Sequence, residues 1–313
     1  MASSVLIVGA GPAGLSLAIA LLRNGVSVKI IDKAPKYFVG TRGAGVMPRT
    51  LELYKIAGIL PEIESVGNPE VPKMRIYTSP EGDSPINEFD MMEISDPDPS
   101  YYRINGLVVL QDDHQAALRG IIEKRYGVSI ELATELVSFE QSPDYVTVKL
   151  LKSSLGTTET HQFDWVVGTD GARSVVRKQL GLSFDGESNV DICLAMRPYK
   201  RNGKQYFWFI CGGANVDVQA IEGNKDRLVE IIYDIIGKKE VVFGDLVAYG
   251  TWRSNVRMVN KFNEGRVFLG GVDTQLMGDP DAAHVHSFTG AQGINTSVQD
   301  SVSCFMFSLP SAV

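Results

Sequence analysis

The chain has 313 residues, of which 44% are hydrophobic and 21% charged, a composition typical of a globular protein with about two domains. It excludes a collagen-like, coiled-coil or disordered chain. The formal net charge of −7 argues against nucleic acid as a partner, because phosphate binding needs a basic surface. The three cysteines include no CxxC pair, so we expect neither a disulfide framework nor structural zinc, and we predict a reducing, cytoplasmic location.

The apolar stretch 5–22 is almost long enough to cross a membrane, but we interpret it as a buried strand, a turn and a helix. Residues 1–4 lack the positive charge with which a secretory signal begins, and glycine and proline interrupt the stretch. We predict a strand over Ser4–Val8, a helix over 12–22 and a second buried strand over 26–31. Such a βαβ unit implies parallel strands with a right-handed crossover.

The hydrophobic patterning of the remaining chain predicts further elements. The predicted helices are 50–56, 112–126, 225–236 and the start of one within 289–300. The predicted strands are 128–131, 135–140 and 145–151, which alternate as antiparallel strands do, and 163–167, 206–210, 246–252 and 266–269. Residues 68–99 are expected to form loops and short strands, and residues 301–313 show no helical period.

Gly9, Gly11 and Gly14 form a GxGxxG pattern between the first strand and the first helix. In a dinucleotide-binding turn the first glycine permits the tight turn, the second lets a pyrophosphate approach the backbone, and the third lets helix pack on strand. The N–H groups at the helix N-terminus then attract phosphate. Asp32, 18 residues after Gly14, ends the second strand, where a carboxylate can bind ribose hydroxyls. We therefore predict a dinucleotide site, and Asp32 favours FAD or NAD over NADP.

Two further stretches have the composition of a ligand site. Arg42 stands beside three small residues and either holds a phosphate or belongs to a surface loop. Asp170 follows a buried strand, at the edge where open α/β sheets bind ligands, with Arg173 and Arg177 close by. The alternative for this second stretch is a helix start with solvated arginines.

A third stretch, residues 281–295, places small residues before a helix start, so that backbone N–H groups would point at a ligand. His284 and His286 lie in it, but two histidines at this spacing, with no third ligand nearby, are poor grounds for a metal site. We predict no metal.

In this order, the motifs resemble the signatures of the class A FAD-dependent aromatic monooxygenases, the para-hydroxybenzoate and phenol hydroxylase type, and most closely those of fungal biosynthetic pathways. The family signatures are GxGxxG, DGxxSxxR and GDAAH…TGxQGxN. Here they stand at residues 9–14, 170–177 and 271–295, and the resemblance covers nearly the whole chain.

The resemblance implies an α/β fold with a Rossmann-like FAD-binding domain of the GR2 flavoprotein type and an inserted β-sheet substrate domain. The expected FAD-binding domain is discontinuous and comprises residues 1–73, 106–182 and 262–313. The expected substrate domain comprises residues 74–105 and 183–261. The family's long C-terminal helix and any further domain are expected to be absent.

The resemblance also implies roles in cofactor binding. Asp32 is expected at the ribose of the FAD adenosine, Arg42 and Gln111 at the phosphates or the flavin, and Asp281 at the ribityl chain. Gln111 begins a Gln-x₆-Leu118 pattern that the family places on a helix beside FAD. The full expected set is Gly9, Gly11, Pro12, Ala13, Gly14, Asp32, Lys33, Arg42, Gly43, Gln111, Arg119, Asp170, Gly171, Arg173, Asp281, Gly293, Ile294 and Asn295.

The implied function is hydroxylation of a phenolic or polyketide-like aromatic, with FAD as cofactor and NADPH or NADH as transient co-substrate; O2 forms a flavin C4a-hydroperoxide, which transfers OH to the ring. The expected partners are thus an aromatic small molecule and O2, without a membrane span, and a homodimer is compatible with this. The aromatic run 206–209 either borders the substrate or fills a sheet core. No catalytic base can be assigned, and Tyr101, Tyr102, Arg103 and Arg253 are weak candidates.

Three departures from the family pattern support a second hypothesis, a truncated flavin-fold protein with little or no catalytic activity. Nine residues, 272–280, separate Gly271 from Asp281, Phe288 replaces the usual proline, and the pattern is lost after Asp300. Two other enzyme classes fit less well. An NAD-dependent dehydrogenase leaves residues 170–177 unexplained, and a flavin halogenase would carry a WxWxIP motif, which is missing here.

Overall fold

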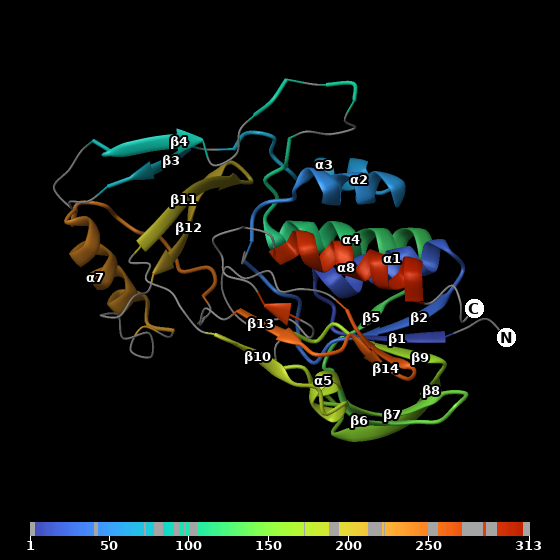
Figure 1. Cartoon of the computed structure of the whole chain (residues 1–313). Helices are drawn as coiled ribbons and strands as arrows, with labels where there is room; N and C mark the ends of the chain where they lie inside the picture. The colour runs from blue at the N-terminus through green and yellow to red at the C-terminus, as the bar shows by residue number, and fades with distance from the viewer. Residues whose placement is uncertain are drawn as a thin grey trace.

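The computed structural model describes residues 4–40, 43–71, 73–77, 84–90, 94–96, 98–100, 105–171, 173–187, 194–211, 221, 223–249, 256–270, 284–285 and 293–308. Its centre is a six-stranded sheet with the strand order β14-β15-β9-β1-β2-β5 (Figure 1). The strands are β1 (Ser4–Val8), β2 (Ser27–Ile31), β5 (Ile130–Glu131), β9 (Trp165–Gly168), β14 (Asn263–Glu264) and β15 (Val267–Leu269). All are parallel except β14, which pairs antiparallel with β15 at one edge.

Helices cover one face of this sheet, with α1 (Pro12–Arg23), α4 (Gln111–Tyr126) and α8 (Gly293–Ser308) side by side in Figure 1. The shorter helices α2 (Pro48–Ile56) and α3 (Leu60–Glu64) pack outside them. An antiparallel sheet of β6 (Thr134–Gln141), β7 (Val146–Lys152) and β8 (Thr157–Phe163) covers the opposite face, beside α5 (Val175–Gln179).

The alternation of side chains along β1 explains this layering. Val5 and Ile7 belong to the hydrophobic core under the helices, whereas Leu6 and Val8 belong to the second core beneath β6–β8. A parallel strand that is covered on both faces needs such a continuous apolar run. The predicted βαβ unit is therefore confirmed, and α1 ends one residue later than predicted, at Arg23, with Asn24 as the C-cap.

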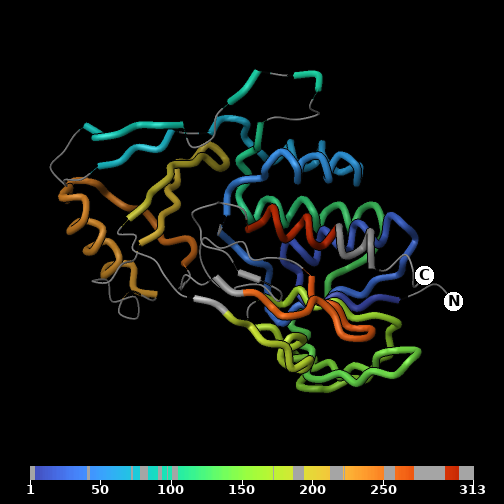
Figure 2. The backbone as a smooth tube through the Cα atoms, viewed as in Figure 1, coloured from blue at the N-terminus to red at the C-terminus, as the bar shows by residue number. Residues whose placement is uncertain are grey.

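The other elements lie to the left of the central sheet in Figures 1 and 2. They include the hairpins β3 (Lys73–Ile76) with β4 (Asn87–Asp90) and β11 (Leu194–Arg201) with β12 (Lys204–Cys211), and the helix α7 (Lys225–Ile236). A small sheet is formed by β10 (Phe184–Glu187), β13 (Val256–Val259) and β16 (His284–Val285). The division of the chain into two domains at the expected boundaries remains a prediction.

Three expectations about secondary structure are wrong. Residues 128–131 do not form an antiparallel strand, because β5 pairs in parallel with β2 and extends the central sheet. The expected strand 246–252 is not found over residues 246–249, which run irregularly along the cavity described below. Strands β8 and β11 were not predicted; β8 is mostly polar and pairs with β7 along one side only, so its sequence shows little hydrophobic patterning.

The third wrong expectation concerns the segment after residue 300, where no helical period is visible in the sequence. Helix α8 continues through it to Ser308. Ser297 and Ser301 are buried in this helix, and their hydroxyls donate to the carbonyl oxygens of Ile294 (2.8 Å) and Ser297 (2.7 Å). These bonds within the helix satisfy the hydroxyls, so serine can face the core. The buried face of α8 therefore shows no apolar pattern in the sequence. No helix in the part of the chain that the structure describes is long and apolar enough to cross a membrane.

A polar pair lies within the helical layer. His114 on α4 and Tyr54 on α2 are buried, and the imidazole Nε2 of His114 lies 2.7 Å from the Tyr54 hydroxyl. Among the described residues the imidazole Nδ1 has no hydrogen-bond partner. Burial raises the pKa of the Tyr54 hydroxyl and lowers the pKa of the His114 imidazole from 6.5 to about 4. The folded protein therefore holds His114 in its neutral form.

We expect acid to destabilise the protein through His114. Between pH 6.5 and 4 the unfolded chain binds a proton that the folded protein excludes, so the free energy of unfolding falls as the pH falls, by about 3 kcal/mol in total. Urea unfolding at a series of pH values measures this loss. His114→Gln should remove most of it, whereas His161→Gln, which changes a histidine on the exposed strand β8, should retain it. An identical pH dependence in the wild type and in His114→Gln would contradict the assignment.

Candidate functional site

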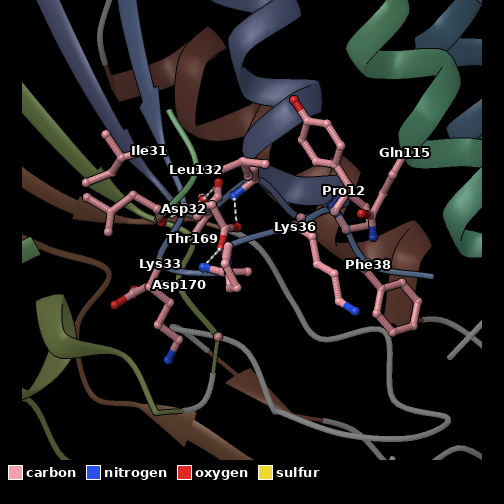
Figure 3. Close-up of a pocket in the computed structure, with 18 of the residues that line it drawn as sticks. Pro12, Ile31, Asp32, Lys33, Lys36, Phe38, Gln115, Leu132, Thr169 and Asp170 are labelled. Carbon is pink, nitrogen blue, oxygen red and sulfur yellow. Dashed lines mark hydrogen bonds between the residues drawn. The ribbon is translucent and has the colours of Figure 1, made fainter. Parts of the chain in front are cut away.

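A cavity of about 830 Å³ opens at the carboxyl ends of β1, β2 and β9, where open α/β sheets bind their ligands (Figure 3). Its walls come from the turn after β1 (residues 9–13), the segment after β2 (residues 31–39) and the residues after β9 (169–171). Gln111 and Gln115 on α4 and residues 246–249 also contribute. The volume lies in the upper range of small-molecule sites, which suits an extended ligand.

Two glycines in the turn after β1 are required by close packing. Gly9 has a φ of 110°, and a Cβ there would lie 2.3 Å from the carbonyl oxygen of Thr169. A Cβ on Gly14 would lie 2.1 Å from the carbonyl oxygen of Gly9. The hydroxyl of Thr169 donates to the carbonyl oxygens of Val8 (3.0 Å) and Gly9 (2.9 Å), which fixes the end of β9 against the turn.

Gly11 has the opposite environment, because a Cβ there would meet no atom within 4 Å. It is the N-cap of α1, with Pro12 as the first helical residue, and no side chain in the described part of the chain caps the helix. The N–H groups of the first helical turn are therefore left for another acceptor, and the positive end of the helix dipole lies at the cavity wall. An open backbone beside an uncapped helix N-terminus fits the diphosphate of a dinucleotide.

Asp32 stands at the centre of the close-up in Figure 3 and connects two walls of the cavity. One carboxylate oxygen accepts a hydrogen bond from the backbone N–H of Ala10 (2.8 Å), and the other accepts one from Ala34 (2.8 Å). The side chain thus holds the glycine turn and the segment after β2 in place. The expected contact of Asp32 with a ribose remains a prediction.

We expect Asp32→Ala to weaken the protein before any ligand is added. The substitution leaves the N–H groups of Ala10 and Ala34 without their charged acceptor, and hydrogen bonds to a charged group contribute about 1.5–3 kcal/mol. Urea unfolding of the ligand-free protein should show a decrease in this range. Asp234→Ala, on the exposed side of α7, is the control and should change the free energy of unfolding little. An unchanged value for Asp32→Ala would show that these two bonds add nothing to stability.

Asp170 organises the turn after β9. Its carboxylate accepts hydrogen bonds from the Ser174 hydroxyl (2.6 Å) and the Val175 N–H (2.7 Å). Ser174 in turn caps α5 by accepting from the N–H of Arg177 (3.0 Å). Burial raises the pKa of the Asp170 carboxyl, although these bonds act to lower it. The side chain therefore shapes the wall, and Gly171 and Arg173 line the cavity beside it.

The cavity unites ten of the residues expected to bind cofactor: Gly9, Gly11, Pro12, Ala13, Asp32, Lys33, Gln111, Asp170, Gly171 and Arg173. The structure does not place Gly14, Gly43, Arg119 or the first turn of α8 in its lining. In that turn Asn295 accepts a bond from the N–H of Met47 (2.6 Å) and donates to the carbonyl oxygen of Gly45 (3.0 Å), so it holds the segment after residue 43. Their roles at the cofactor remain predictions. Arg42, Asp281, residues 272–280, Phe288 and the weak base candidates Tyr101, Tyr102, Arg103 and Arg253 lie outside the described residues.

Several lining residues were not predicted. Gln115 follows Gln111 by one helical turn, so the spacing of α4 would have identified it. Lys36 and Tyr37 belong to the segment after β2, and the guanidinium of Arg119 lies 4.0 Å from the centre of the Tyr37 ring. Residues 246–249 are distant in sequence and show no pattern that would have indicated a place in the wall.

Comparison with characterised proteins gives similarity over almost the whole chain. It is 32% identical to a flavin-dependent monooxygenase of Mycobacteroides abscessus, a match that covers 95% of this chain and 65% of that protein. It is 27% identical to pentachlorophenol 4-monooxygenase of Sphingobium chlorophenolicum, over 95% of this chain and 56% of that protein. The chain thus spans less than two thirds of the length of these relatives. A particular closeness to fungal enzymes remains a prediction.

Solved structures show the same fold. A flavin-dependent monooxygenase, PieE, in complex with FAD and substrate superposes with a TM-score of 0.78 at 22% identity, over 99% of this chain and 59% of that one. Aklavinone-11 hydroxylase with FAD and aklavinone gives a TM-score of 0.75 at 24% identity, over 97% and 62%. The FAD binding domain family matches residues 2–193 and 189–306. The chain therefore belongs to the FAD binding domain family, that of the class A flavin-dependent aromatic monooxygenases.

Proposed function

We propose that this chain binds FAD in the cavity at the carboxyl ends of β1, β2 and β9 and hydroxylates a phenolic or polyketide-like aromatic with O2 and NAD(P)H. The observation that carries the proposal is the open backbone at Gly11 beside the uncapped N-terminus of α1, within a cavity large enough for an extended ligand. Relatives named pentachlorophenol 4-monooxygenase and aklavinone 12-hydroxylase support the substrate class.

The chain's own residues have separate tasks in this proposal. The first turn of α1 binds the diphosphate through its N–H groups, and Asp32 holds the turn in the shape that receives it. Gln111 and Gln115 offer amide groups from α4, and Lys33 and Lys36 supply positive charge from the segment after β2. When bound, FAD supplies the redox chemistry, namely hydride uptake from NAD(P)H and activation of O2. The protein must orient the aromatic ring and exclude water.

Absorption spectroscopy of the purified chain after incubation with FAD tests the first half of this proposal. We expect a flavin spectrum that differs from that of free FAD and stays with the protein on gel filtration. NADPH or NADH oxidation with a panel of phenols then tests the second half, with hydrogen peroxide measured in parallel to separate hydroxylation from wasteful oxidation. Tight FAD binding without phenol-dependent turnover would favour a truncated flavin-fold protein with little activity. A chain that takes up no FAD would contradict the proposal as a whole.

The same proposal includes a cytoplasmic location and, as a compatible assembly, a homodimer. Its oxygen-transfer route is the one implied by the family resemblance.

A further inference from the structure

Arg201 connects the β11–β12 hairpin to the N-terminus of α4. Its Nη1 donates to Oδ2 of Asp112 (3.0 Å) and its Nη2 to Oδ1 of the same carboxylate (2.8 Å). The guanidinium also contacts Asp113. Asp112 is only 8% exposed and Arg201 28%, so this ion pair is better shielded from water than an ordinary surface pair. The paired, parallel geometry is one that arginine can make and lysine cannot.

The same carboxylate holds a third segment. Oδ2 of Asp112 accepts a hydrogen bond from the N–H of Gly40 (2.9 Å), and the N–H of Asp112 donates to the carbonyl oxygen of Gly40 (3.3 Å). Gly40 has a φ of 107°, and a Cβ there would lie 3.0 Å from the Cβ of Ala248. Four segments of the chain therefore meet at this point, which we call the Asp112 junction: Gly40, Asp112, Arg201 and Ala248.

The Asp112 junction is continuous with the cavity wall. Gln111 and Val39 line the cavity and directly precede Asp112 and Gly40 in the chain, and Ala248 lines it as well. Arg201 is not among the lining residues. A ligand in the cavity would therefore lie against Ala248 and the chain neighbours of Gly40 and Asp112, but not against Arg201 itself.

A tight turn and a stacked cross-strand tyrosine pair brace the β11–β12 hairpin, so a contact that fixes Arg201 also fixes the strands beside it. Asn202 and Gly203 have φ values of 51° and 74°, and Arg201 pairs with Lys204, so the turn is a tight two-residue loop. Tyr199 and Tyr206, the third cross-strand pair from the turn, stack with ring centres 5.3 Å apart. Among the described helices and strands β11 and β12 pack mainly on each other, and the Arg201 link at the turn joins them to α4.

We propose that Arg201 is a positioning residue that fixes the β11–β12 hairpin to the cofactor cavity, so that cofactor binding and hairpin placement are coupled. A ligand that restricts the motion of residues 31–39 and Gln111 also restricts Gly40 and Asp112. Through its ion pair with Asp112, Arg201 then restricts the motion of the hairpin and its aromatic run 206–209. By linkage the effect is reciprocal, and the hairpin contact strengthens ligand binding by the same factor. The ligand-dependent part of this inference rests on the proposed binding of FAD.

Hydrogen–deuterium exchange of the β11–β12 amides, measured with and without FAD, tests the coupling, and an FAD titration gives the dissociation constant. In the wild type we expect FAD to slow exchange in the hairpin. In Arg201→Met we expect faster exchange without FAD, loss of the FAD-dependent slowing, and FAD affinity lower by about tenfold. Arg201→Lys keeps the charge without the paired bonds and should fall in between; it also serves if the methionine variant does not fold.

Arg227→Met is the matched control, because Arg227 forms an exposed pair with Glu230 on α7. It should behave as the wild type in all three measurements. Unchanged FAD affinity and unchanged FAD-dependent slowing in Arg201→Met would overturn the coupling. A wild-type chain that binds no FAD would contradict the proposed function instead. In that case the exchange rates of the ligand-free proteins still test whether Arg201 attaches the hairpin to the cavity wall. Equal hairpin exchange in the wild type and in Arg201→Met would show that it does not.

Discussion

Gly11→Val is expected to lower the affinity for FAD by about a hundredfold or more, equivalent to about 3 kcal/mol, while the protein stays folded. A Cβ at this position meets no described protein atom within 4 Å, and Gly11 lines the cavity, so we expect the added side chain to extend into the open space along the cavity wall. That space is where the diphosphate must approach the backbone. Valine is a poorer N-cap than glycine, which we expect to cost about 1 kcal/mol of stability.

Fluorescence titration with FAD and urea unfolding of the ligand-free variant measure the two effects separately. Gly11→Ser is the matched variant, because serine caps helices well and adds a smaller side chain. It should preserve or raise stability and reduce FAD affinity less than valine does. Full retention of FAD affinity in Gly11→Val would mean that the ligand does not pass Gly11, and the proposed site would have to be abandoned.

Whereas Gly11→Val should mainly lower FAD affinity, Gly14→Ala should lower the free energy of unfolding of the ligand-free protein, by about 3 kcal/mol or more. A Cβ on Gly14 would lie 2.1 Å from the carbonyl oxygen of Gly9 and 2.7 Å from the hydroxyl of Thr169. The first of these atoms is backbone, held by the glycine turn, so no side-chain rotation can relieve the overlap. Helix α1 would have to move away from β1, and the buried layer between α1, α4 and the sheet would open.

Thermal and urea unfolding of the ligand-free protein measure this effect without any cofactor. Gly120→Ala is the control, because Gly120 also lies in a helix but a Cβ there meets nothing within 4 Å. Alanine at that position should stabilise the protein by about 0.5–1 kcal/mol, since it favours helix and restricts the unfolded chain. If Gly14→Ala were as stable as Gly120→Ala, that result would contradict the close packing of α1 against the glycine turn at Gly14.

The sequence alone determined the parts of the protein that depend on local rules. The apolar run of β1, the GxGxxG turn and the start of α1 at Pro12 follow from strand burial and glycine conformation, and all were predicted; the end of α1 was predicted to within one residue. The position of Asp32 at the end of β2 also follows from the spacing within one βαβ unit. For this reason six expected cofactor-binding residues of this unit do line one cavity, namely Gly9, Gly11, Pro12, Ala13, Asp32 and Lys33.

The tertiary structure decided what depends on contacts between distant segments. The direction of β5 could not be read from its sequence, because a two-residue strand carries no sign of its partner, and pairing with β2 made it parallel. The extension of α8 depends on buried serines that bond within the helix and therefore mask its buried face. The Asp112 junction joins residues 40, 112, 201 and 248, and only the folded chain brings their charges and backbone groups together.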